Sequence, residues 1–72
     1  MNEIDRMLRA ALKSRDQSAI AEAYLAAAEA QFDINENEPA WFLLTHAYIH
    51  ALEAGLPIAA MLEARLKAEN RA

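Results

Sequence analysis

Alanine makes up a quarter of this chain, glycine occurs once, and valine is absent. Alanine is the strongest helix former, whereas glycine in a helix interior costs about 1 kcal/mol relative to alanine. Strands favour β-branched and aromatic residues. The composition therefore predicts an all-α fold that has no strands.

The chain is short, and no covalent cross-link is available to stabilise it. Its 72 residues suggest a single helical domain spanning 1–72. There is no cysteine, so disulfides and thiolate metal sites are excluded. Small domains bury a small share of their surface and need regular packing or oligomerisation instead. We therefore expect either very regular helix packing or self-association.

The sequence predicts neither a signal peptide at the N-terminus nor a membrane-spanning segment. Residues 1–6 (Met-Asn-Glu-Ile-Asp-Arg) are not followed by an apolar run, so no signal peptide is expected. No apolar stretch approaches the roughly 20 residues of a membrane span. The expected location is cytoplasmic, without a membrane partner.

Apolar residues at helical spacing predict four helices, over residues 3–13, 17–32, 39–54 and 57–69. Ser14 or Asp16 suits the start of the second helix, and Asn37 with Pro39 suits the start of the third. Gly55, the one glycine, is expected in a left-handed C-cap.

Short connections usually make consecutive helices antiparallel neighbours. The prediction is two helical hairpins, helices one with two and three with four, joined by the polar loop 33–38. The alternative is a three-helix bundle in which the first or last helix packs poorly.

The third predicted helix is apolar almost all round. Such a helix is either central in its own domain or part of an interface. Its apolar surface exceeds what three short helices should cover, so the excess predicts a protein-binding surface. The interface candidates are Trp41, Phe42, Leu43, Ile49 and, from the second helix, Phe32.

Residues 41–60 contain part of a known repeat pattern. Trp41, Leu44 and Tyr48 have the W-x2-L-x3-Y spacing, and Ala60 stands at a small-residue position further on. In this half the chain resembles a tetratricopeptide-repeat helix pair. Thr45 replaces the glycine of that pattern, and Ala64 replaces an aromatic residue. The resemblance implies peptide or protein binding without catalysis.

Two histidines lie one helical turn apart, with a carboxylate one turn further along. His46, His50 and Glu53 could hold zinc, but the H-E-x-x-H signature is absent. Two half-exposed histidines on a packed helix are the simpler interpretation. The sequence analysis therefore assigns no metal and no cofactor, and keeps these three residues as weak candidates for metal binding.

Charge is unevenly distributed along the chain. The net charge is −4, which opposes general nucleic-acid binding. The first helix and the turn after it nevertheless carry a basic group, whereas residues 16–64 contain no lysine or arginine. That basic group is Arg6, Arg9, Lys13 and Arg15. Nucleic-acid binding through this face is an alternative, but an unfavoured one.

Catalytic signatures are missing from the sequence. There is no cysteine nucleophile and no glycine-rich phosphate loop. The resulting hypothesis is a small, non-enzymatic, helical protein-interaction module that forms a homo-oligomer, most simply a homodimer. Metal binding and a nucleic-acid-binding regulator are the two alternatives.

Overall fold

A computed structural model describes residues 3–71 as four α-helices. They are α1 (Glu3–Ser14), α2 (Gln17–Asp33), α3 (Asn37–Ala54) and α4 (Ile58–Ala68). Met1, Asn2 and Ala72 lie outside the described residues, so the start of the chain and the outer limits of the predicted domain are not addressed. The predicted all-α class with four helices is confirmed.

A side chain caps the start of α2 but not the start of α3. The Asp16 carboxylate accepts hydrogen bonds from the backbone N–H groups of Ser18 (3.0 Å) and Ala19 (3.5 Å), which caps α2. At α3, Glu36 is the N-cap, and it makes no side-chain cap hydrogen bond. The predicted cap Asn37 is instead the first helical residue, because α3 begins two residues before Pro39.

Within two residues after the end of each helix, one residue adopts the left-handed backbone conformation. These residues are Arg15 (φ 60°), Asn35 (φ 61°), Gly55 (φ 67°) and Asn70 (φ 59°). Glycine and asparagine adopt this conformation most readily. The predicted left-handed cap at Gly55 is therefore confirmed, while Arg15 adopts the same conformation with a full side chain.

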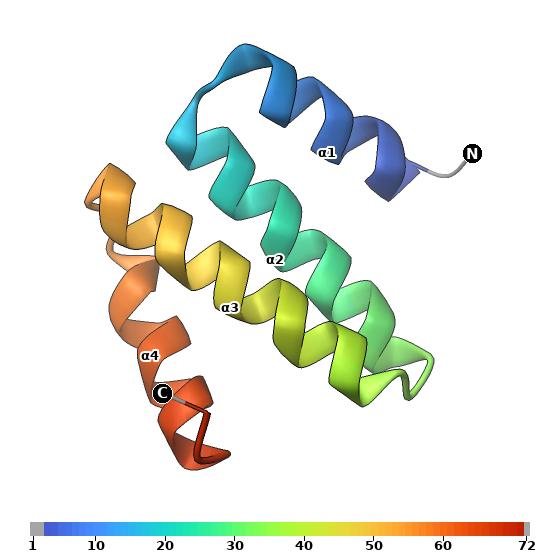
Figure 1. Ribbon diagram of the computed structural model, residues 1–72, viewed down its shortest axis with the longest axis vertical. Helices are drawn as coiled ribbons and strands as arrows, with labels where there is room; N and C mark the ends of the chain where they lie inside the picture. Colours follow the sequence, from blue (N-terminus) through green and yellow to red (C-terminus); the bar gives the residue numbers. More distant parts are fainter. Residues whose placement is uncertain (1–2, 72) are drawn as a thin grey trace.

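The four helices form a flat assembly, with Cα extents of 31 × 29 × 13 Å. Close backbone approach occurs between consecutive helices, and the contact is most extensive between antiparallel α2 and α3 (Figure 1). The loop between them is residues 34–36, shorter than the predicted 33–38, and it joins the two helices that pack most closely. Since α1 approaches α2 and α4 approaches α3, the two central helices organise the molecule.

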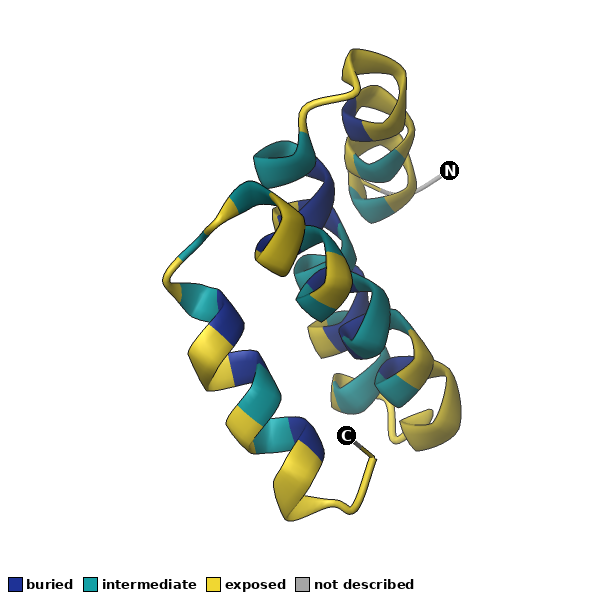
Figure 2. Ribbon diagram, turned by 60° about the vertical axis from the view of Figure 1, so that its left-hand side comes forward, coloured by how far each residue is buried: buried dark blue, intermediate teal, exposed yellow. Residues whose placement is uncertain are grey.

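Buried residues are coloured dark blue in Figure 2, and most of the buried apolar residues are alanines. Large side chains that are fully buried within residues 3–71 are confined to Leu44, Leu62 and Leu66. They pack with alanines of α2, α3 and α4, including Ala28 and Ala47. A second, smaller cluster of Ala11, Ile20 and Ala23 joins α1 to α2. Alanine buries little apolar area, so this core contributes modest hydrophobic stabilisation.

Polar contacts tie α4 to the central helices. The Tyr48 hydroxyl donates a hydrogen bond to Glu63 (3.2 Å), joining α3 to α4. Burial and the Glu63 carboxylate together raise the pKa of Tyr48. Arg65 donates two hydrogen bonds of 3.2 Å to Glu29, joining α4 to α2.

Within residues 3–71, no helix combines the length and the apolar character that crossing a bilayer requires.

Candidate interaction surface

The five interface candidates divide into two groups in the structure. Phe42 is 64% exposed and Ile49 is 46% exposed. Leu43 is half-buried against the main core. Trp41 and Phe32 are also half-buried, and they contact each other. Phe42 and Ile49 therefore remain available to a partner.

Trp41 and Phe32 belong to an aromatic cluster at the end of the molecule where α2 turns into α3. Their rings meet edge to face with centroids 4.9 Å apart. The Arg65 guanidinium lies 5.5 Å from the Phe32 centroid, and that of Arg71 lies 5.2 Å from the Trp41 centroid. Arginine over an aromatic face is stabilising and covers the ring. These two candidates therefore have partners within the chain.

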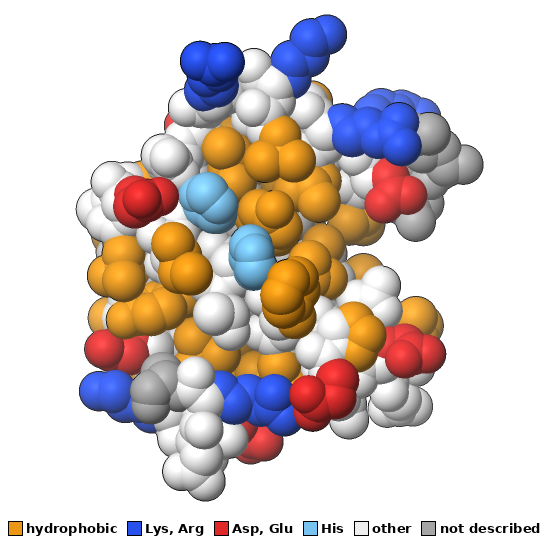
Figure 3. Space-filling view, viewed as in Figure 1, with side chains coloured by type: hydrophobic (Ala, Val, Ile, Leu, Met, Phe, Trp, Pro, Cys, Tyr) orange, Lys and Arg blue, Asp and Glu red, His pale blue; other side chains and the backbone are white. Residues whose placement is uncertain are grey.

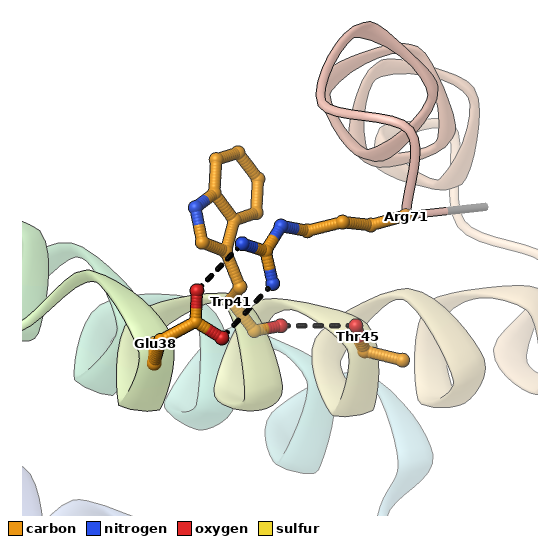
Figure 4. A network of polar contacts seen from close by, with 4 residues as sticks. All are labelled: Glu38, Trp41, Thr45 and Arg71. Atoms are coloured by element: carbon orange, nitrogen blue, oxygen red, sulfur yellow. Dashed lines mark hydrogen bonds and ion pairs between the residues drawn. The ribbon is translucent and has the colours of Figure 1, made fainter.

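Arg71 also holds the start of α3 (Figure 4). Its two terminal nitrogens donate to the two Glu38 carboxylate oxygens, at 2.7 and 3.4 Å. These hydrogen bonds, and then the charge of Arg71, lower the pKa of Glu38 below its ordinary value of 4.5. Nearby, the Thr45 hydroxyl donates to the Trp41 carbonyl (2.9 Å). We call the contact of Arg71 with Glu38 and Trp41 the C-terminal clasp.

The outward side of α3 carries a mixed apolar and histidine surface. At 3.6 residues per turn, five residues fall within about 100° of arc. We define the α3 face as these five: Phe42, His46, Ile49, His50 and Glu53. The opposite side of the helix carries the buried residues Ala40, Leu44, Ala47 and Ala51. Leu52, which lies outside the α3 face, is also 54% exposed.

Figure 3 shows that apolar and charged side chains occupy different parts of one broad side of the molecule. Hydrophobic side chains and both histidines occupy its centre, and charged side chains lie mainly around its edge. An apolar centre with a polar rim is the usual anatomy of a protein–protein interface. Isolated exposed apolar residues are common, but a contiguous group of them indicates a binding surface.

The two histidines are fixed by an aromatic residue that sequence spacing does not reveal. The Tyr24 ring of α2 stacks almost parallel on His50, with centroids 5.6 Å apart and planes 3° apart. It also contacts His46 at 5.2 Å. The Phe42 ring also contacts His46, with centroids 4.5 Å apart. Both imidazoles are therefore half-buried and packed.

Hydrogen bonds define which ring nitrogens carry protons. His46 Nδ1 lies 3.0 Å from the Phe42 carbonyl oxygen. His50 Nδ1 contacts the Gln17 side-chain oxygen, and it lies 3.7 Å from a Glu53 carboxylate oxygen. Carbonyl and carboxylate oxygens only accept hydrogen bonds, so Nδ1 is the donor in both rings. Glu53 therefore lies beside His50 Nδ1 and away from Nε2.

The three weak metal candidates do not form a complete metal site within the chain. Across residues 3–71, no group of three or more histidine, aspartate or glutamate side chains is placed to hold a metal ion. His46 and His50 remain as a pair on one helix, with Glu53 on the Nδ1 side of His50.

The basic residues of α1 remain largely free. Arg6 pairs with Glu3 at 3.5 Å, and both side chains are highly exposed. Arg9, Lys13 and Arg15 make no ion pair with any residue from 3 to 71. A shallow hollow of ≈ 470 Å³ lies between α1 and α2, and none of these basic residues lines it. Its walls combine apolar residues such as Met7 and Ala11 with the polar or acidic residues Ser14, Asp16 and Glu22.

Titratable side chains in the described part of the chain are all at least partly exposed. Among residues 3–71 no polar or charged side chain is fully buried. Desolvated titratable groups are typical of active sites, and the perturbed groups here belong to the clasp and to the Tyr48–Glu63 contact.

Comparison with protein-family models, with curated proteins and with solved structures gives no match to this chain.

Proposed function

We propose that this protein is a non-enzymatic, helical protein-interaction module that self-associates through the α3 face. The observation that carries the proposal is the exposure of Phe42 (64%) and Ile49 (46%) on one side of the central helix. Fully burying a side chain of this kind contributes about 1.5–3 kcal/mol. A second copy that covers both residues would recover that free energy.

The small core supports the same proposal. Three leucines are the large side chains fully buried within residues 3–71, and the other buried apolar residues are alanines and Ile20. A domain of this size without disulfides is expected to be marginal on its own. Self-association would supply the burial that the alanine-rich core lacks.

Complementary charges would set the relative orientation of the two copies. Arg9, Lys13 and Arg15 on one end of the molecule are unpaired within residues 3–71, while Glu22 and Glu36 are exposed acidic groups elsewhere. Complementary charges at an interface rim orient partners more than they stabilise them. Basic ends of one copy would therefore lie near acidic residues of the other.

The finer architecture belongs to the same proposal. We infer that α3 and α4 act as a helical hairpin of tetratricopeptide style, in which Leu44 packs inward and α3 offers a binding face. Ala59 is buried and Ala60 is exposed, so the small residue that contacts α3 would be Ala59, one position before the one expected from the pattern.

The test is the molar mass of the protein in solution between about 1 and 100 μM, measured by sedimentation velocity in the presence of EDTA. We expect a concentration-dependent dimer, which Phe42→Ser or Ile49→Ser converts to monomer. Ile34→Ser is the matched control, because Ile34 is as exposed as Phe42 (64%) but lies in the α2–α3 loop. A monomer at every concentration would disprove self-association in the absence of metal.

A further inference from the structure

His46 and His50 share a feature of metal-binding histidines. In metal sites, a ligating histidine generally donates its other ring N–H to a carbonyl, a carboxylate or water, which fixes the tautomer and the ring orientation. Here His46 Nδ1 donates to the Phe42 carbonyl, and His50 Nδ1 donates to Gln17 with Glu53 nearby. In the neutral form of each ring the lone pair is then on Nε2, and no residue from 3 to 71 hydrogen-bonds to it.

The pair is also held in place. The histidines are four residues apart on α3, which puts them on the same side of the helix one turn apart. Tyr24 contacts both rings, and Phe42 contacts His46. Neither Nε2 makes a hydrogen bond within residues 3–71. Packing that restricts the rings lowers the entropic cost of binding a ligand.

One chain supplies two nitrogen ligands and no more. No third histidine, aspartate or glutamate joins them within residues 3–71, and the Glu53 carboxylate is directed to Nδ1 of His50. Zinc in proteins is usually four-coordinate and tetrahedral, with histidine among its preferred ligands. Two more ligands must therefore come from outside the chain.

We propose that His46 and His50 form half of a site for zinc or a chemically similar divalent ion, and that the same two residues of a second copy complete it. This inference rests on the proposed self-association through the α3 face. In a two-fold symmetric dimer the same patch meets itself. Since both histidines lie on that patch, the four Nε2 atoms of two copies would meet around one ion. Each Nε2 would donate its lone pair to the ion, and the oxidation state of the ion would not change.

The experiment uses untagged, chelator-treated protein, to which zinc chloride is added. Titration calorimetry should give one zinc per two chains, and sedimentation velocity should show the dimer dissociation constant falling by about tenfold or more, which is 1.4 kcal/mol. Cobalt(II) should give the visible absorption of a tetrahedral site. His46→Ala and His50→Ala should each abolish all three signals.

Two further variants test the geometry. Gln17→Ala removes the acceptor on His50 Nδ1 and should weaken zinc binding by about tenfold, the usual effect of losing such a partner. Glu53→Gln should leave the cobalt spectrum and the stoichiometry unchanged, since its carboxylate lies away from Nε2. Circular dichroism of each variant verifies that the helices remain.

The outcomes separate this inference from the proposed function. One zinc per chain without a change in mass would overturn completion by a second copy, and zinc binding that survives both histidine variants would overturn the site. A dimer that forms in EDTA, and whose dissociation constant zinc does not change, would support self-association and overturn the metal site. A monomer in EDTA that zinc converts to a histidine-dependent dimer would support the site and refute metal-free association.

Discussion

The Arg71 guanidinium lies 5.2 Å from the centroid of the Trp41 indole while it donates two hydrogen bonds to Glu38. Asn70, in the left-handed region, turns the chain after α4, and the backbone N–H of Arg71 donates to the Leu66 carbonyl (2.7 Å). These bonds aim the arginine at the first turn of α3. A residue near the end of the chain thus covers the single tryptophan of the protein and neutralises a carboxylate beside it.

The C-terminal clasp should open in acid. Because Arg71 lowers the pKa of Glu38, the clasp stabilises the fold fully above the ordinary value of 4.5 and loses that contribution as pH falls through the lowered pKa. Trp41 fluorescence should shift to longer wavelength in that range as the indole becomes exposed. Glu38→Gln, which cannot ionise, should lack this transition, and a shift identical to wild type would contradict the assignment.

Arg65 should matter more to stability than its neighbour Lys67. Arg65 pairs with Glu29 of another helix and covers the Phe32 ring, whereas Lys67 makes an exposed pair with Glu63 within α4, at 3.7 Å. We expect Arg65→Ala to lower the free energy of unfolding by about 1 kcal/mol. Lys67→Ala should change it by less than about 0.5 kcal/mol. Urea denaturation measures both, and equal losses would refute the ranking.

The close approach of α2 to α3 depends on small side chains. Ala28 of α2 and Ala47 of α3 are both completely buried in the main core. Ala47→Leu would insert three more carbon atoms where the helices meet, and should cost about 1–3 kcal/mol of unfolding free energy. Ala60→Leu is the control, because Ala60 is exposed on α4 and should tolerate the change within about 0.5 kcal/mol. A neutral Ala47→Leu would mean that the core contains unused space.

Helix positions were predictable because local chemistry determines them. Asp16 can cap only the helix that follows it, and Gly55 tolerates a left-handed turn that most residues avoid. The predicted bounds of α2 and the predicted end of α3 therefore agree with the observed ones to within about one residue. Asn37 was wrong as a cap because α3 extends to it, with Glu36 before it.

The open side of α3 was harder to predict, because the helix is apolar almost all round and no polar stripe marks the solvent side. The clasp was not predictable for another reason. Glu38 and Arg71 are 33 residues apart, and nothing in their spacing indicates contact. Tyr24 likewise meets the histidines only through the packing of α2 on α3.

Arg15 and Gly55 both have positive φ (60° and 67°). Removing the side chain at Arg15 and adding one at Gly55 should therefore change the stability of the protein in opposite directions. An L-residue in this conformation costs about 1–2 kcal/mol relative to its usual regions, and glycine avoids the cost. Gly55→Ala should therefore destabilise the protein by about 1 kcal/mol. A Cβ there meets nothing within 4 Å, so the loss would reflect backbone strain alone. Arg15→Gly should stabilise the protein by up to about 1 kcal/mol, reduced by the greater freedom of glycine in the unfolded chain. Urea denaturation of both variants measures the two changes in unfolding free energy. If Arg15→Gly destabilises the protein by as much as Gly55→Ala, then side-chain contacts, and not backbone conformation, control the α1–α2 turn.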